Sequence, residues 1–564
     1  MTVRRLITIL LMSLAATALS AQTQTQAPAA PRTTETVTAE TDQDINNPRA
    51  LRLSLDQALQ LAMERNLGIQ VQRLESQISN QTLRSEYGVF DPNATALVRE
   101  FSSDSPATST FESSSFRQRL ANFGLTQFLP TGGQYTIGYD NERRETAGGG
   151  NFVNPAVETG LGFSFTQPLL RDFGIDVNRR AITIARNNLG ITDEAFRLGL
   201  MNTAVSVEQA YLDLIYARRA VDVVKESLFL ARDQARITQI RIDVGASAPL
   251  DILQPRVTIA TSEEQLILAV AGVRDAEDRL RALLNLDPAE WDRPIVPTDP
   301  VEYQPLAVDP ASAVAQALRL RPELRQQNLT IENLRVQQLF ARNQVLPAVD
   351  LDLGYKLGGI SGTTLRTDPT TGETTVIDRT NYFNALNQVG GFEFPEWRVG
   401  FNVAIPLSNI GARSLYRRAQ LDLEQSRTTQ AQTQQNIVVE VRGAARDVET
   451  AARTIVATRA ARDAAERNVE AERRRYENGM TTNFQVLEVQ QQLSDARVRE
   501  LQALVGYNQA VSAFHRAVGD ILDVHNIRVN PPEHEAEPKM FPSLDRYTWL
   551  NYNSHVKVEE NKTP

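Results

Sequence analysis

Two glycine-containing turns, each followed by an acidic residue, carry the residue types best suited to chemistry in this chain. The first turn lies at 244–249 and the second at 478–482. Each turn has a glycine that suits the left-handed position after a helix. The carboxylates of Asp251 and Glu488 lie about one turn into the next helix, where the helix dipole also favours acids. Carboxylates grouped around an opening would attract cations, whereas ordinary helix capping is an equally simple reading of the glycines.

The sequence offers no set of residues suited to catalysis. It has no cysteine, which excludes thiol nucleophiles, thiolate metal sites and disulfides. All four histidines lie near the end of the chain, where solvated histidines are favoured over metal ligands. No phosphate-binding loop, nucleophile elbow or HExxH motif occurs. We therefore predict that the protein is not an enzyme and uses no cofactor or metal, and an exported hydrolase has no residues to support it.

The charge of the chain argues against nucleic acid as a partner. The formal net charge is −9, and the arginine-rich segments alternate with glutamate along predicted helices. Such segments are typical of solvated helix faces rather than of phosphate-binding surfaces. We predict that nucleic acid is not a partner.

A long helical rod must position the first turn. Between residues 178 and 243, apolar or small residues recur at alternating steps of three and four, the spacing of a heptad seam. At ~1.5 Å per residue the rod would be roughly 99 Å long, so it must pack along other long helices. A helix is expected to return over 250–284. The seam residues are Val207, Ala210, Leu214, Ala217, Val221, Val224, Leu228, Ala231, Ala235, Thr238 and Ile242.

The rod and its return occur twice. Moving 234 positions along the chain takes Val207 to Val441 and brings the first turn onto the second. The second copy predicts a rod over 412–477 and a return over 483–518. An internal repeat of this kind predicts two antiparallel helical hairpins with equivalent cores. Two polar residues fall on the second seam, Arg462 and Glu472.

Between the helices the apolar period becomes two, which indicates strands. In the first repeat, strands are expected at about 94–102, 116–128, 133–142 and 159–167. The second repeat has two strand faces within 349–405, separated by a Gly/Thr-rich loop at about 357–395. Strands of about ten residues with one apolar face, joined by short turns on one rim and long loops on the other, are typical of outer-membrane barrels. A soluble sandwich is the alternative.

The remaining segments frame the two repeats. Two arginines, an apolar stretch and small residues make residues 1–21 a predicted secretory signal peptide, so we expect export. A membrane anchor is less favoured, because about 20 apolar residues are needed to span a bilayer. The predicted division is a signal peptide at 1–21, a disordered lead-in at 22–50, a first repeat at 51–286, a Pro-rich linker at 287–309, a second repeat at 310–522 and a polar tail at 523–564.

The ordered duplication over residues 51–522 resembles the TolC-like outer-membrane efflux factors. The second turn matches that family's tip pattern at Tyr476, Gly479 and the pair Val486 and Leu487. The resemblance implies a mainly α fold with β, in which duplicated long antiparallel helical hairpins form an α-barrel and the strands form a membrane β-barrel, closed as a homotrimer. It implies an outer-membrane location that extends into the periplasm and contacts outer-membrane lipid. It also implies two protein partners, a periplasmic adaptor (membrane fusion) protein and an inner-membrane pump of the RND or ABC type.

The resemblance also assigns candidate site residues. It implies a pore constriction lined by Asp251, Gln485 and Glu488. Relatives carry a basic lock residue where this chain has Thr481, so the lock of the family is not carried over to this chain, whereas a ring of three Glu488 is. The residues implied in adaptor contact at the helical tips are Gly245, Ala246, Ser247, Gly479, Met480 and Thr481.

Two alternatives stay open from the sequence. The family pattern has two strands per repeat and twelve per trimer, but four strands are predicted here in the first repeat. Either the barrel has eighteen strands or the 116–142 segment lies outside the wall. The favoured function is a passive exit duct for efflux or type I secretion, and the alternative is a trimeric coiled-coil structural or adhesive surface protein.

Overall fold

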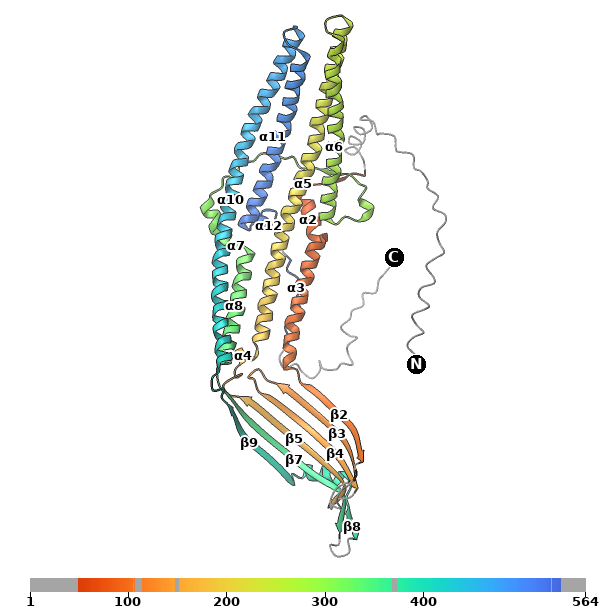
Figure 1. Ribbon diagram of the computed structural model, residues 1–564, viewed down its shortest axis with the longest axis vertical. Coiled ribbons are helices and arrows are strands. Elements are labelled where there is room, and N and C mark those ends of the chain that lie inside the picture. The colour runs from red at the N-terminus through yellow and green to blue at the C-terminus, as the bar shows by residue number, and fades with distance from the viewer. Residues whose placement is uncertain are drawn as a thin grey trace, which may run out of the picture.

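The computed structural model describes residues 49–104, 106, 114–147, 152–367, 373–528 and 530–538. Two long helical hairpins stand side by side, and one antiparallel sheet continues from their lower end (Figure 1). The predicted signal peptide lies outside the described residues, as do nearly all of the predicted lead-in and part of the tail. The turns of both hairpins lie at the end of the molecule opposite the sheet (Figure 1).

The first hairpin is built around α5, Arg180–Asp243, a helix of 64 residues. Its return helix α6, Leu253–Leu284, covers the upper part of α5. The lower part is covered by α3, Leu67–Glu86, which follows α2, Leu55–Arg65 (Figure 1). Ser54 begins α2 with a capping box, because its Oγ accepts from the Gln57 N–H while Gln57 Oε1 accepts from the Ser54 N–H. One continuous helix is thus paired with two shorter helices, α3 below and α6 above.

The second hairpin repeats this arrangement. The long helix is α10, Ile410–Glu477, and its return is α11, Asn483–Val518. The lower partner is α8, Pro322–Asn343, which follows α7, Pro310–Leu320. Asp309 caps α7 by accepting from two backbone N–H groups. Two short helices, α4, Ile175–Asn178, and α12, Ile521–Val524, lie next to the hairpins. No side chain caps the start of α5 at Arg179.

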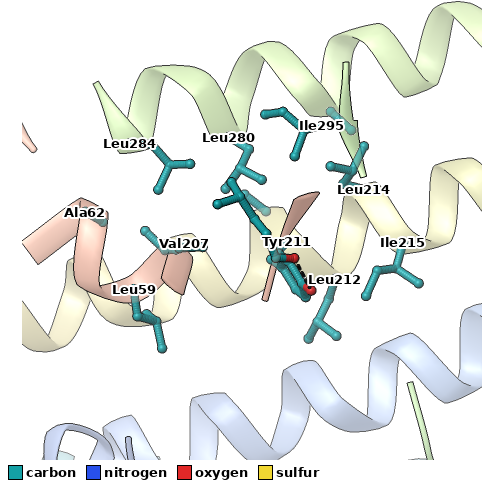
Figure 2. Close-up of a cluster of buried hydrophobic side chains, with 14 of the residues drawn as sticks. Leu59, Ala62, Val207, Tyr211, Leu212, Leu214, Ile215, Leu280, Leu284 and Ile295 are labelled. Carbon is teal, nitrogen blue, oxygen red and sulfur yellow. Dashed lines mark hydrogen bonds between the residues drawn. The ribbon is translucent and has the colours of Figure 1, made fainter. Parts of the chain in front are cut away.

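The two repeats bury equivalent positions. Val207 and Val441 are both fully buried, and each lies in the core of its own hairpin. Around Val207, side chains from α2, α5 and α6 meet those of a short strand (Figure 2). That strand is β6, Ile295–Pro297, which pairs in parallel with β1, Leu51–Leu53. The other repeat-related buried pairs are Leu214 and Val448, Val221 and Ile455, Val273 and Tyr507, Leu280 and Phe514, and Leu284 and Val518.

The sheet contains both repeats in one antiparallel order, β2-β3-β4-β5-β7, with β8 and β9 both paired to β7. The four strands predicted for the first repeat are present, and they are longer than expected. The predicted loop at 357–395 is wrong, because much of this Gly/Thr-rich segment forms strands that pair with β5 and β7. Pairing with strands far away in the sequence leaves no local apolar pattern, so the sequence did not indicate it. The strands are β2 Asn93–Asp104, β3 Ser115–Phe128, β4 Gln134–Ala147, β5 Val153–Pro168, β7 Ala348–Thr367, β8 Thr374–Arg379 and β9 Phe394–Ala404.

The two faces of the sheet differ in chemistry. A row of apolar side chains crosses five strands on one face, which we call the apolar face. The adjacent row on the other face, the polar face, begins with three glycines from three neighbouring strands and ends with two charged residues. The apolar row is Leu125, Ile137, Phe163, Tyr355 and Trp397, and the polar row is Gly124, Gly138, Gly162, Lys356 and Glu396.

The former loop region also contains a helix, α9, Tyr382–Gly390, that packs on β7 and β5. Close approach of its backbone requires a glycine in β7, because a Cβ at Gly359 would lie 2.1 Å from the Ala385 carbonyl oxygen. Ala385 is fully buried. No helix in the part of the chain that the structure describes is both apolar enough and long enough to cross a bilayer.

Part of the polar tail is docked on the helices, and the expectation of a solvated histidine is wrong for His525. The Glu537 carboxylate accepts two hydrogen bonds from the Arg186 guanidinium, at 2.8 and 2.7 Å, and one from the Tyr87 hydroxyl at 2.6 Å. His525 also lies 3.2 Å from a Glu208 carboxylate oxygen and is largely buried. The tail around Glu537 is therefore an extended segment that ion pairs anchor to α3 and α5, which its polar composition does not indicate.

Removing the hydroxyl of Tyr211 should destabilise the first hairpin. Tyr211 is 1% exposed, and its hydroxyl donates to Leu53 O at 3.0 Å or Asp299 Oδ2 at 3.1 Å. The same hydroxyl accepts from the Asp299 N–H at 3.3 Å, so Tyr211→Phe removes one donor and leaves that N–H without its acceptor. We expect a loss of about 1–3 kcal/mol in the free energy of unfolding, measured by urea denaturation. Tyr216→Phe, at a half-buried tyrosine on the same helix, is the matched control. Equal effects of the two substitutions would contradict the assignment.

Anchoring of the tail should depend on pH. Hydrogen bonds from Arg186 lower the pKa of Glu537 from 4.5 to about 2. The ion pair therefore stabilises the docked tail above the ordinary carboxyl pKa, and this stabilisation is lost as pH falls through about 2. Glu537→Gln should release the tail at pH 7, seen as faster amide hydrogen exchange in 533–538. Glu533→Gln, an exposed residue of the same segment, should leave exchange unchanged, and equal protection in both variants would remove Glu537 as the anchor.

Candidate functional site

The first tip is closed by backbone hydrogen bonds around Gly245. Its φ of +74° is the left-handed conformation that glycine adopts without strain. The Ala246 N–H donates to Arg241 O at 2.8 Å, which ends α5. A short 3-10 helix, η2, Pro249–Ile252, then leads into α6. The Asp251 carboxylate accepts from the Ala248 N–H at 3.1 Å, so part of its role is to cap this turn.

The second tip repeats the same closure. Gly479 has a φ of +73°, and the Met480 N–H donates to Arg475 O at 2.9 Å. Thr482 and Gln485 have the spacing of a capping box, but the Thr482 side chain makes no capping hydrogen bond. Gln485 is therefore not used in the cap, and its side chain is exposed.

The candidate constriction residues share an exposed position close to the tips. Asp251, Gln485 and Glu488 are all exposed, whereas the intervening Val486 and Leu487 are buried. The side chains at 485 and 488 are three residues apart, and therefore lie on one side of α11. The Glu488 carboxylate accepts from Gln492 Nε2 at 3.2 Å on the same helix. Its charge is thus available at the surface of a single chain.

Polar contacts bring the two tips together. Asn483 Nδ2 lies 3.4 Å from Asp251 O, and Gln234 Nε2 donates to Asn483 Oδ1 at 2.6 Å. The Arg241 guanidinium donates to Tyr476 O at 2.9 Å and lies 4.4 Å from the centre of the Tyr476 ring. We call Arg241 and Tyr476 the tip clasp.

Sequence reasoning had matched Tyr476 to a family pattern and missed Arg241. The two residues of the tip clasp are 235 positions apart, so no local spacing connects them. The available signal was the alignment of the two repeats, which places both residues near the ends of their rods. The resemblance implies a basic residue in relatives at the position of Thr481, and this chain has none there. Arg241 of the first hairpin contacts the end of the second rod.

Exposed apolar side chains surround both turns. Val244, Leu250 and Met480 each have more than 70% of their surface exposed, and Phe484 has 59%. Large apolar groups concentrated at one end of a molecule are typical of a surface that another protein covers. Val244 lies within the first turn as predicted, but Val244, Leu250 and Phe484 were not among the predicted contact residues.

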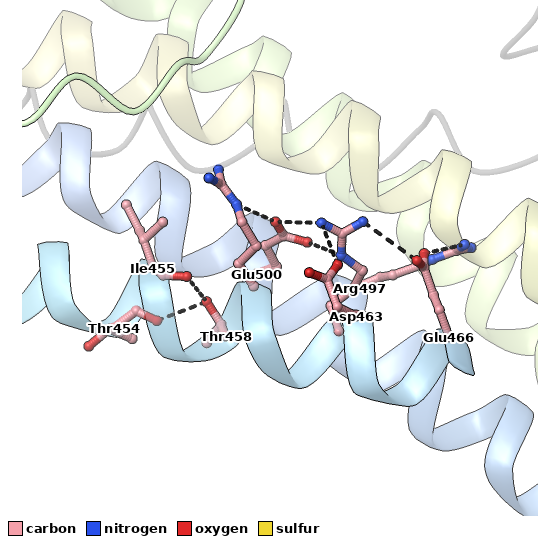
Figure 3. Close-up of polar contacts among 9 residues, drawn as sticks. Thr454, Ile455, Thr458, Asp463, Glu466, Arg497 and Glu500 are labelled. Atoms are coloured by element: carbon pink, nitrogen blue, oxygen red, sulfur yellow. Dashed lines mark hydrogen bonds and ion pairs between the residues drawn. The ribbon is translucent and has the colours of Figure 1, made fainter. Parts of the chain in front are cut away.

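Below the second tip, an ion-pair ladder replaces the apolar seam. Arg462 and Arg459 on α10 both reach Glu500 on α11, at 3.0 and 3.4 Å (Figure 3). Arg497 pairs with Glu466 across the same interface and with Glu226 on α5, and these bonds raise the pKa of Arg497.

The second polar residue on the seam, Glu472, is buried and pairs with Arg475 at 3.2 Å. The two polar residues predicted on the seam are therefore both compensated by partners.

A cluster of His534, Ser76 and Asp193 does not have the geometry of a catalytic triad. His534 Nε2 lies 2.9 Å from Ser76 Oγ and 3.3 Å from Asp193 Oδ1. A nucleophilic triad uses both ring nitrogens of histidine, whereas here one nitrogen faces both groups, and Ser76 is fully buried. Across the residues that are described, no group of three or more His, Asp or Glu side chains is arranged to hold a metal ion.

Long paired helices that end in acid-bearing tips, joined to a sheet with one apolar face, define a membrane exit channel. The sequence matches the family described as Outer membrane efflux protein over residues 127–286 and 313–520. It is 22% identical to the outer membrane efflux protein BepC of Brucella suis biovar 1 (strain 1330), covering 81% of this chain and 92% of BepC. It is also 22% identical to the outer membrane protein TolC of Vibrio cholerae, covering 57% and 69%. The outer-membrane channel OprN superposes with a TM-score of 0.60 at 17% identity, covering 85% of this chain and 91% of OprN.

The chain belongs to the outer membrane efflux protein family. It is an outer-membrane efflux channel of the TolC type, with a periplasmic extension, and is a transport protein rather than an enzyme. The predictions of family, fold class, function and location are confirmed. The individual roles of the tip residues stay predictions.

Loosening the tip clasp should open the tips. Arg241→Met keeps the side-chain length and removes the charged donor, and losing such a hydrogen bond costs about 1.5 kcal/mol or more. The open fraction should then rise roughly tenfold, measured as open probability in single-channel recordings. Arg236→Met is the matched control, because Arg236 pairs only with Asp233 one turn away on the same helix in the described structure. An unchanged open probability in Arg241→Met would exclude the clasp.

Proposed function

We propose that three copies of this chain assemble into a passive exit duct, in which the hairpins form a tunnel and the sheets form the membrane wall. The apolar stripe on α3 supports assembly, since Leu67, Val71, Leu74 and Ile78 recur at helical spacing and each is more than half exposed. A second copy would cover this stripe. The absence of catalytic chemistry in the sequence fits a duct that is driven by a partner.

Rings of tip residues would form the constriction. In a threefold assembly Asp251, Gln485 and Glu488 each occur three times around the axis. Three like charges across a narrow opening repel one another and attract cations. The single observation that best supports this role is that all three side chains are exposed, Asp251 on η2 and the other two on α11 beside the buried Val486 and Leu487.

The tips would also receive a periplasmic adaptor protein, itself bound to an inner-membrane pump of the RND or ABC type. Met480, one of the residues assigned by resemblance, and Val244 beside the first turn offer exposed apolar contacts, and Gly245 and Gly479 are also exposed. The proposed contact residues are Gly245, Ala246, Ser247, Gly479, Met480 and Thr481. Site-specific cross-linking from Met480, followed by identification of the captured protein, tests this assignment, and capture of an inner-membrane pump without an adaptor would contradict it.

The coiled-coil adhesin alternative makes a different physical prediction. A structural rod needs no continuous water path, whereas a duct must conduct ions. Purified protein should run as a trimer in detergent and give stepwise conductance in a planar bilayer. A folded trimer that never conducts would support the adhesin and contradict the duct.

Neutralising the ring at position 488 should weaken cation selectivity. Glu488→Gln removes three charges from the constriction at little cost in shape, so the cation-to-anion permeability ratio should fall towards one. Reversal potentials under a salt gradient measure this ratio. Glu449→Gln, at an exposed glutamate in the middle of α10, should leave the ratio unchanged. Equal ratios in wild type and Glu488→Gln would exclude Glu488 from the narrowest part.

A further inference from the structure

The sheet ends in two open edges, the strands β2 and β9. In the described residues β2 pairs only with β3, and β9 pairs only with β7. Each edge therefore presents a row of backbone N–H and C=O groups without strand partners. Inside a bilayer no water satisfies such groups, so the edges of a membrane sheet must be paired.

The two edges are complementary in direction. β2 follows α3 and runs away from the helices, whereas β9 runs back towards them and leads into α10 (Figure 1). The strands of the main sheet thus alternate in direction from one edge to the other, and their number is even. A β9 edge placed beside the β2 edge of another copy continues the antiparallel pattern without interruption.

We propose that six strands from each copy close an eighteen-stranded barrel in the trimer, with the β3–β4 hairpin inside the wall. This inference rests on the proposed threefold assembly. Because barrel diameter grows roughly linearly with strand number, the lumen would be about 1.5 times as wide as that of a twelve-stranded wall. The membrane segment would then be a wide exit, and the tips would set the limit on cargo.

The faces of the β3–β4 hairpin support a place in the wall. On the apolar face Leu125 and Ile137 continue directly into Phe163 of β5. On the polar face Gly124 and Gly138 continue into Gly162 in the same way. The apolar row stays apolar and the glycine row stays glycine from β5 across β4 to β3, as expected if all three strands lie in one wall.

The hairpin is also tied to the helices at its base. The Gln127 amide donates to Phe90 O at 2.8 Å, and the Phe90 and Phe128 rings stack with their centres 6.0 Å apart. A hairpin outside the wall would have to break its long registers with β2 and β5 as well as these contacts.

Edge pairing can be tested with engineered cysteines, because the natural sequence contains none. Thr95→Cys on the polar face of β2 is combined in turn with Arg398→Cys, Gly400→Cys or Asn402→Cys on the polar face of β9. At least one combination should give disulfide-linked trimers on a non-reducing gel after oxidation. Ala96→Cys, which faces the opposite side of β2, replaces Thr95→Cys in the matched control and should not cross-link.

The outcomes separate this inference from the function on which it rests. If the protein is not a trimer in detergent, the proposed assembly itself fails. If trimers form and no β2–β9 combination cross-links, the closure by these edges is wrong.

Pore size tests whether the hairpin lies in the wall. Deleting residues 114–151 joins β2 to β5 and leaves four strands per copy. The largest polyethylene glycol that enters from the sheet side and lowers conductance should be about one third smaller in radius for this variant than for wild type. Equal cut-offs would place the hairpin outside the wall and overturn the proposal.

Fluorophore labelling gives an answer even if the deletion variant fails to fold. In the full-length chain, a fluorophore on Ile137→Cys should be quenched by brominated lipid, and one on Gly138→Cys should not. Quenching at neither position or equally at both would overturn the placement of β4 in the wall.

Discussion

The structure depends on burial of an apolar seam that is too long for any single compact domain. At ~1.5 Å per residue α5 is roughly 96 Å long, and its seam residues Val207 and Val221 are almost fully buried. Since α6 is about half as long, α3 has to complete the cover below it. This pairing of one continuous helix with two shorter ones sets where each hairpin turns and where the chain enters the sheet.

The contacts that hold the tips together differ in kind from those along the rods. Along the rods the hairpins are held by apolar packing, whereas at the tips they are joined by polar contacts such as the tip clasp and the Gln234–Asn483 hydrogen bond. Polar contacts close to solvent contribute less than buried apolar area and respond to charge. Separation of the tips therefore needs no disruption of either core, which suits a channel that opens at one end while its body stays folded.

Local spacing predicted much of the fold and less of the site. The heptad seam, the repeat and the two glycine turns depend on neighbours within a few residues, so the sequence shows them directly. The tip clasp joins Arg241 to a residue in the other repeat, and the tail is anchored through Arg186 to Glu537, and neither contact has a local pattern. Helix α9 lies in a Gly/Thr-rich segment whose structure comes from packing against β7. Asp251 and Glu488 could be placed just after the turns, but their exposure depends on which side of each helix the seam occupies.

The three aligned glycines on the polar face leave part of the sheet without side chains. Gly124, Gly138 and Gly162 lie in one registered row, and Lys356 and Glu396 continue this row on the next two strands. If the polar face lines the lumen of the proposed barrel, cargo at this level would meet bare peptide groups on three strands and a lysine and a glutamate beside them. Such a surface would offer hardly any apolar contact and would hold a charged solute only along one side.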